Sequence, residues 1–153
     1  MARDDWPIKF TVRNMSGLVA NIHQFDRETL QDMQSHMVVS AGLVVRRIRE
    51  LCAKDTLYMK QHARARMSPQ NLAFDAGWFR EDFIGQQDYK GKVIRSFYPV
   101  PVENGWHDRA GRFHAGKPSL PQALAQTQRY IVDGTSALIQ LNMQRAAARG
   151  GRR

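Results

Sequence analysis

The residues best suited to chemistry lie between positions 98 and 124, where the sequence reads YPVPVENGWHDRAGRFHAGKPSLPQAL. His107 and His114 flank a turn that contains glycine, and Asp108 stands between them. Imidazole and carboxylate groups together serve as metal ligands or as an acid–base pair. None of the five histidines, however, has a second histidine three or four positions away, so the helical metal-binding spacing is missing. We therefore favour exposed loop histidines over a catalytic or metal site.

The other nucleophiles and acids also lack the spacing of catalytic motifs. The single cysteine, Cys52, ends an apolar helical pattern, which is typical of a buried thiol rather than a nucleophile. The sequence contains no GxSxG elbow, Walker loop or GxGxxG turn. Glu103 is the only acid within residues 89–107, so a carboxylate pair would require Glu81 or Asp82 to approach it in the fold. We predict a protein that is not an enzyme, with no cofactor and no metal.

The charge of the chain limits its partners. There are 23 lysines and arginines against 14 acids, which gives a net charge of +9 and a pI near 10.3. This excess favours an acidic protein partner or nucleic acid. Because the sequence has no RNA-binding motif, we would expect nucleic acid to be bound through its phosphates, without recognition of its base sequence. Solvated loops and a frayed tail would explain the same excess equally well. The candidate contacts to an acidic partner are Lys60, Arg64, Arg66, Arg145 and Arg149.

Length and composition are those of one soluble domain. With 153 residues, 42% of them hydrophobic and 24% charged, we expect a single domain over residues 1–145 and a basic tail over 146–153. One cysteine excludes an intramolecular disulfide. No apolar run approaches the roughly 20 residues that cross a bilayer, and the first residues lack the apolar core of a secretory signal. We therefore expect assembly in the cytoplasm and no membrane partner.

The periodicity of the sequence predicts the elements that must position these residues. In order, they are a strand over 7–14, a helix over 26–53, a basic connection over 54–72, two strands over 74–87 and 92–100 joined by DYKG, and a helix that begins near Ser119. The predicted class is α+β, a small antiparallel β-sheet flanked by a long N-terminal helix and a C-terminal helix.

Details of the two helices predict how they begin and pack. Asp26 and Ser119 are expected as N-caps, with Pro121 in the first turn of the second helix. Val38, Val39 and Val45 widen the apolar stripe of the first helix, which favours a wider core within the chain over a subunit contact. Gly134 costs the second helix about 1 kcal/mol relative to alanine, so we expect close packing or a bend there.

Three patches of the chain, taken in order, resemble one family. Residues 76–83, AGWFREDF, follow a Thr-Gly-x-Leu-x-x-Ser-Ile pattern, and residues 98–105, YPVPVENG, follow Tyr-Ala-x-Tyr-Val-Glu-Phe-Gly. Residues 118–123, PSLPQA, are similar to the Pro-Phe-Leu-x-Pro-Ala that opens a last helix. The order and spacing resemble the neck and tail-completion proteins of long-tailed siphophages, which are tail-terminator-like head–tail joining proteins related to the minor tail protein Z group of lambda-like phages. The resemblance spans about residues 20–145.

The resemblance implies a structural virion protein without catalytic activity. Such proteins assemble as a ring, commonly a hexamer, at the head-proximal end of the tail tube. The ring completes the tube and presents a surface to the head connector, while genomic DNA passes through the lumen without its sequence being read. The implied partners are other copies of the chain, the tail tube protein, the head connector and this DNA. Phe79 and Arg80, in the first patch, are expected at the contacts between subunits. In such a ring the five basic residues named above would line the lumen or contact an acidic tube subunit.

By the same resemblance, the opening stretch is expected to be a docking loop. Pro99 and Pro101 lack N–H donors, so we expect them to end strand pairing and to leave Glu103 on a rigid, exposed rim. Trp106 and Phe113 are large apolar groups in a polar loop, as expected of interface anchors. A lid over the chain's own core would use the two aromatic residues equally well.

Overall fold

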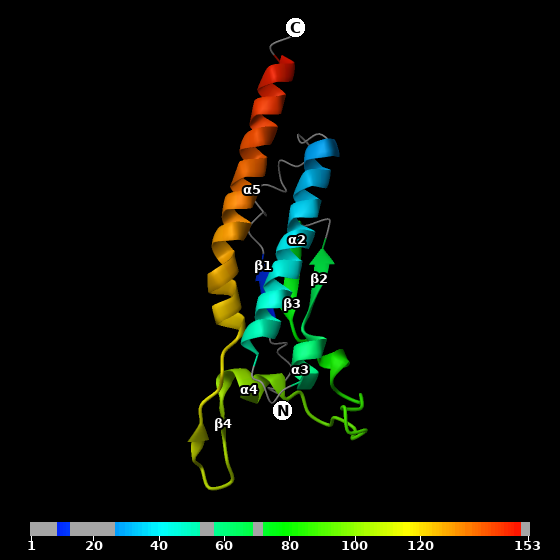
Figure 1. The fold of residues 1–153 in the computed structure, drawn as a ribbon, viewed down its shortest axis with the longest axis vertical. Coiled ribbons are helices and arrows are strands. Elements are labelled where there is room, and N and C mark those ends of the chain that lie inside the picture. Colours follow the sequence, from blue (N-terminus) through cyan, green and yellow to red (C-terminus); the bar gives the residue numbers. More distant parts are fainter. Residues whose placement is uncertain (1–8, 13–26, 53–56, 69–71, 151–153) are drawn as a thin grey trace, which may run out of the picture.

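The computed structural model describes residues 9–12, 27–52, 57–68 and 72–150. The elements in chain order are strand β1 (Lys9–Val12), helices α2 (Arg27–Leu51) and α3 (Leu57–His62), strands β2 (Arg64–Ser68) and β3 (Ala73–Gly77), the 3₁₀ helix η3 (Arg80–Asp82), helix α4 (Pro99–Asn104), strands β4 (Trp106–His107) and β5 (Phe113–His114), and helix α5 (Leu120–Gly150). Figure 1 shows two long helices side by side, with the β4–β5 hairpin projecting at the lower end. The predicted α+β class is confirmed.

The larger sheet has three antiparallel strands in the order β1-β3-β2. Its register pairs Ala65 with Ala76 and Met67 with Phe74. Successive residues of a strand point to opposite faces, so these four side chains share one apolar face of the sheet. All four belong to, or pack against, the core that α2 covers. The alternate residues of β2 and β3, which include two arginines and an aspartate, share the opposite face.

Helix α2 follows the predicted apolar stripe closely and differs from the predicted range by one residue at its start and two at its end. Met33, Met37 and Val44 are buried on the side that faces the sheet and α5. Val45 is also buried, whereas Val38 and Val39 are 58% and 56% exposed. A wider core therefore accounts for Val45 but leaves two adjacent valines in solvent. The predicted cap Asp26 lies outside the described residues, as do residues 13–26 between β1 and α2.

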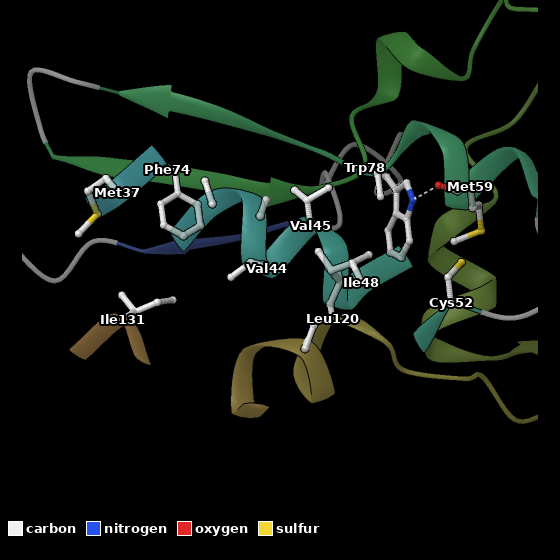
Figure 2. Packing of buried hydrophobic residues seen from close by; sticks show 14 of the residues in the cluster. Met37, Val44, Val45, Ile48, Cys52, Met59, Phe74, Trp78, Leu120 and Ile131 are labelled. Carbon is white, nitrogen blue, oxygen red and sulfur yellow. Dashed lines mark hydrogen bonds between the residues drawn. The ribbon is translucent and has the colours of Figure 1, made fainter. Parts of the chain in front are cut away.

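Helix α2 lies between the sheet and α5, as Figure 2 shows. Leu120 and Ile131 of α5 are buried in the same hydrophobic cluster as α2 and the sheet. Gly134 packs against His36 of α2 so closely that a Cβ on the glycine would lie 2.3 Å from the imidazole Cε1. The close packing predicted for Gly134 is thus confirmed. The helix continues past residue 145 to Gly150, through the start of the predicted basic tail.

Residues 54–72, predicted to be a long connection, contain α3 and β2. Tyr58 and Met59 of α3 are buried, and the indole N–H of the fully buried Trp78 donates to the Met59 carbonyl at 2.8 Å. Strand β2 then pairs with β3, so two strands of the sheet come from residues 64–68 and 73–77. The prediction of a long connection missed the strand because β2 carries only Ala65 and Met67 toward the core, and two apolar residues between charged neighbours give too weak a signal.

The hairpin predicted over residues 74–100 is also different. Beyond Gly77 the chain forms η3. Residues 92–98 contribute an isolated bridge between Gln87 and Val93 instead of a strand, and Pro99 begins α4. The predicted turn at DYKG is confirmed, since the Asp88 carboxylate accepts the N–H groups of Lys90 and Lys92 and Gly91 adopts a φ of 74°. Within the described residues no helix is long and apolar enough to cross a membrane.

Pro99 and Pro101 lie in helix α4 and do not end a strand. A proline is tolerated in the first turn of a helix, because the N–H groups there have no partner within the helix. Their prediction as strand terminators was wrong for this reason: the same missing donor suits a helix start. Helix α4 directly precedes the β4–β5 hairpin, and so it sets where that hairpin leaves the body.

Candidate assembly surface

The buried carboxylate of Glu103 joins α4 to the start of α5. It accepts the N–H of Ser119 at 3.0 and 2.9 Å, the N–H of Leu120 at 3.0 Å, and the Ser119 hydroxyl. Glu103 is only 4% exposed. The first N–H groups of a helix lack partners within the helix and form the positive end of its dipole, so a carboxylate is well suited to this position.

Two predictions change at this contact. Glu103 does not stand on an exposed rim, because its side chain is used within the chain. Ser119 does precede the helix as predicted, but the carboxylate of Glu103 accepts the N–H of Leu120 and the Ser119 hydroxyl donates to that same carboxylate. Pro121 lies in the first turn of α5, as predicted. The prediction missed the cap because a residue 16 positions away leaves no local signal.

The same contact fills the place where an external anion would bind. The loop before α5 carries Gly116 and Lys117, a pair that also occurs in phosphate-binding loops, but Pro118 follows in place of serine or threonine. Helix N-termini bind phosphate through free N–H groups. Here the N–H of Leu120 is taken by Glu103, so this end of α5 is closed to phosphate.

Two glycines let the chain leave α4 and return against itself. Gly105 has a φ of 87°, and a Cβ there would lie 2.5 Å from the carbonyl oxygen of His114. At Gly116 a Cβ would lie 2.3 Å from the carbonyl oxygen of Glu103. The N–H of Lys117 donates to the Val102 carbonyl at 2.8 Å and closes the base. The hairpin is therefore fixed to the body on both of its strands.

Asp108 organises the turn of the hairpin. Its Oδ1 accepts the N–H groups of Ala110 and Arg112 at 2.9 Å each, and its Oδ2 lies 3.0 Å from the Arg112 Nε and 3.3 Å from the His114 Nε2. The hydrogen bond from the Arg112 backbone is the largest cause that lowers the pKa of the Asp108 carboxyl, with the His114 side chain adding to it. This aspartate has a structural role, and the described residues contain no group of three metal-ligating side chains.

The hairpin displays one aromatic pair on each face. Trp106 stands opposite His114 with the rings stacked at 4.4 Å, and His107 stands opposite Phe113 at 5.1 Å. Neighbouring residues of a strand point to opposite faces, so Trp106 and Phe113 lie on different faces. Trp106 is 50% exposed and Phe113 59% exposed. The prediction of a lid over the core is wrong, since both rings stay at the surface of a projecting hairpin.

The first patch forms a separate charged cluster on the outer face of the sheet. Phe79 is 2% exposed and lies beneath the guanidinium groups of Arg64 and Arg66, at 5.0 and 4.0 Å from the ring centre. Arg64 binds Asp82 at 2.6 and 2.9 Å, and Arg66 forms an ion pair with Glu81. Phe79 therefore does not offer an exposed contact to a neighbour, and neither acid meets Glu103.

The remaining predicted sites are spread over the molecule. Arg80 is exposed at the start of η3, and Lys60 is exposed on α3 with no ion pair to another described residue. Arg145 forms ion pairs with Asp32 at 3.3 Å and Glu28 at 3.6 Å, which tie α5 to the start of α2. The side chain of Arg149 lies outside the described residues. Cys52 is buried, as predicted.

We compared the chain with protein-family models, with curated protein sequences and with solved structures, and none of these matches it.

Proposed function

We propose that this chain is a structural virion subunit that forms a ring at the head–tail junction of a long-tailed phage. In this proposal the ring completes the tail tube and joins it to the head connector, and DNA passes through its lumen. The observation that carries the proposal is the β4–β5 hairpin, which projects from the body and exposes an aromatic residue on each face. Exposed aromatic residues are enriched at the centres of protein interfaces.

A two-faced projection suits a ring better than a simple dimer. In a two-fold dimer the same patch meets itself, whereas in a closed ring each subunit offers one surface to the next copy and another to the previous one. Trp106 and Phe113 provide two such apolar surfaces on a single element. A two-stranded hairpin is marginally stable alone, and here the Glu103 contact and the two glycines fix its base.

The contact of Glu103 with Ser119 also supports the resemblance that motivates the proposal. The second patch, residues 98–105, contributes the carboxylate, and the third patch, residues 118–123, contributes the N–H groups that it binds. The two patches are thus parts of one structural unit, which gives a physical reason for finding them together in one sequence.

Mass measurement across protein concentrations tests the ring. We expect the full chain to form a species of several subunits, commonly six, whose population rises with concentration or on addition of tail tubes. Replacement of both exposed aromatics (Trp106→Ala with Phe113→Ala) should abolish this species and leave a folded monomer. Tyr89→Ala serves as the matched control, because Tyr89 is a 66% exposed aromatic residue on the DYKG turn at residues 88–91, away from the hairpin. A wild-type monomer at all concentrations, with and without tubes, would overturn the proposal.

The same measurement separates the ring from a nucleic-acid-binding module, which the net charge of +9 favours. A monomer that joins a short DNA duplex, with affinity falling steeply as salt rises, would replace the ring by that alternative. The structure weighs against tight phosphate binding, since Arg64, Arg66 and Arg145 are all paired with acids.

A further inference from the structure

A groove of about 660 Å³ lies between the flank of α2 and strand β2. Figure 1 shows β2 on the other side of α2 from α5. The apolar part of the groove includes Val38, Gly42 and Val45 from α2, and Ala65 and Met67 from β2. A Cβ at Gly42 would meet nothing within 4 Å, so the groove is open beside this glycine. The 58% exposure of Val38 places an uncovered apolar side chain at the same surface.

Strand β2 forms the border of the groove and is an edge strand. It pairs with β3 on one side, and among the described residues no strand pairs with its other side. An edge strand presents N–H and C=O groups that can pair with a strand of another chain. A strand added there would direct alternate side chains toward the flank of α2, since the inward face of β2 carries Ala65 and Met67.

The groove is surrounded by an excess of positive charge. Its lining includes four cations against one acid, a net charge of +3: Arg46, Arg49, Lys60 and Arg64 against Glu50. Glu50 is already paired with Arg46 and Arg47. Lys60 has no acid partner among the described residues, and the Arg49 guanidinium donates to the Ala63 carbonyl at 2.8 Å. Two positive groups therefore border the apolar surface without an acid of their own.

We propose that this groove binds an extended, acidic segment of a partner protein by adding it to the sheet beside β2. The backbone of the segment pairs with the edge of β2, and its alternate apolar side chains pack against Val38 and Val45. Its carboxylates lie near Lys60 and Arg49. This mode gives affinity through backbone hydrogen bonds and specificity through alternate side chains. The binding surface is separate from the β4–β5 hairpin, so the inference does not depend on the ring.

The chemistry of the groove favours a protein segment over nucleic acid. Single-stranded nucleic acid binds where bases stack on aromatic rings beside a positive groove. The residues that line this groove include valine, alanine and methionine but no aromatic ring. Two of the three arginines that line the groove, Arg46 and Arg64, are held by acids, which reduces the charge available to phosphates.

The test uses a fluorescent peptide of about eight residues, the length of an ordinary strand, in which glutamate and valine alternate. Polarisation measures its binding to the full chain, and backbone amide shifts locate the site. We expect saturable binding with shifts in residues 64–67 and along the exposed flank of α2. A peptide with lysine in place of glutamate should not bind.

Adjacent residues supply the matched controls. Val38→Glu should weaken binding about tenfold or more, whereas Val39→Glu should leave it unchanged, because Val39 is equally exposed but does not line the groove. Lys60→Glu should weaken binding about as much as Val38→Glu does. Lys90→Glu should leave binding unchanged, because Lys90 lies on the DYKG turn and does not line the groove. Absence of binding, equal binding by the Val38 and Val39 variants, or amide shifts elsewhere would overturn the proposal. Tight binding of a single-stranded oligonucleotide at the same residues, in preference to the peptide, would also overturn it.

Discussion

The carboxylate of Glu103 caps helix α5 by accepting the N–H groups of Ser119 and Leu120, 16 and 17 positions further along the chain. Between these residues the chain builds the β4–β5 hairpin and returns to the same point. The cap thus holds together the end of α4, the base of the hairpin and the start of the longest helix. The carboxylate that we expected to contact a neighbouring subunit fixes instead the element that carries the aromatic residues.

Replacement of Glu103 by glutamine should destabilise the fold by about 1–2 kcal/mol. The amide retains one acceptor oxygen, but the negative charge at the positive end of α5 and one acceptor for its N–H groups are lost. Urea unfolding followed by circular dichroism measures the change. Asp133→Asn is the matched control, because Asp133 is exposed and its pair with Arg129 should contribute little. Equal stability of the Glu103 variant and wild type would contradict the capping role.

Local patterns in the sequence sufficed for the long helices and failed where the fold depends on distant contacts. The stripe through Met33, Met37 and Val44 repeats within one helix, so periodicity predicted α2 almost to its ends. The capping role of Glu103 depends on a partner 16 residues away, and no local spacing reveals it. For Trp106 and Phe113 the sequence left a choice between an interface and a lid over the core. Their exposure excludes the lid, and the interface stays a proposal.

The errors in the sheet have a similar cause. Strand β2 turns only Ala65 and Met67 inward, between arginines that dominate the local composition. Residues 92–100 contain enough aromatic and β-branched residues to suggest a strand. However, Phe97 and Tyr98 pack edge-on against Phe83, each with ring centres 5.3 Å apart, so they contribute to the core without entering a sheet.

Two glycines in the long helices should respond oppositely to alanine. Gly134→Ala should destabilise the protein by up to about 2 kcal/mol, since overlap of the new Cβ with the His36 imidazole costs more than the roughly 1 kcal/mol that alanine gains in a helix. Gly42→Ala should stabilise it by up to about 1 kcal/mol, because its Cβ meets open space and alanine favours helix. Thermal and urea unfolding of both variants measure the contrast. The double variant Gly134→Ala with His36→Ala should lose less than the two single losses combined, and strict additivity would contradict the predicted overlap.

Tyr98 should make the protein sensitive to alkaline pH. Burial is the main cause that raises the pKa of its phenol to about 12, from an ordinary value of 10.0. The fold therefore favours the neutral phenol, and the stabilisation that this provides is fully present below pH 10.0 and is lost as the pH rises toward 12. The free energy of unfolding should fall over this range in wild type and fall less in Tyr98→Phe. Parallel curves for the two proteins would contradict the assignment.

Asp108 should make the order of the hairpin depend on acid pH. Hydrogen bonds, with the Arg112 backbone first, hold the pKa of this carboxyl below its ordinary value of 3.8. The ionised form is favoured by the folded turn, so its contribution is present above pH 3.8 and is lost as the pH falls through the lowered pKa. The amide resonances of Ala110 and Arg112, which donate to Oδ1, should report this titration. Asp108→Asn keeps that acceptor without the ionisable group, and its amide resonances should not show the transition. A wild-type midpoint at or above 3.8, or the same transition in Asp108→Asn, would show that another group controls the turn.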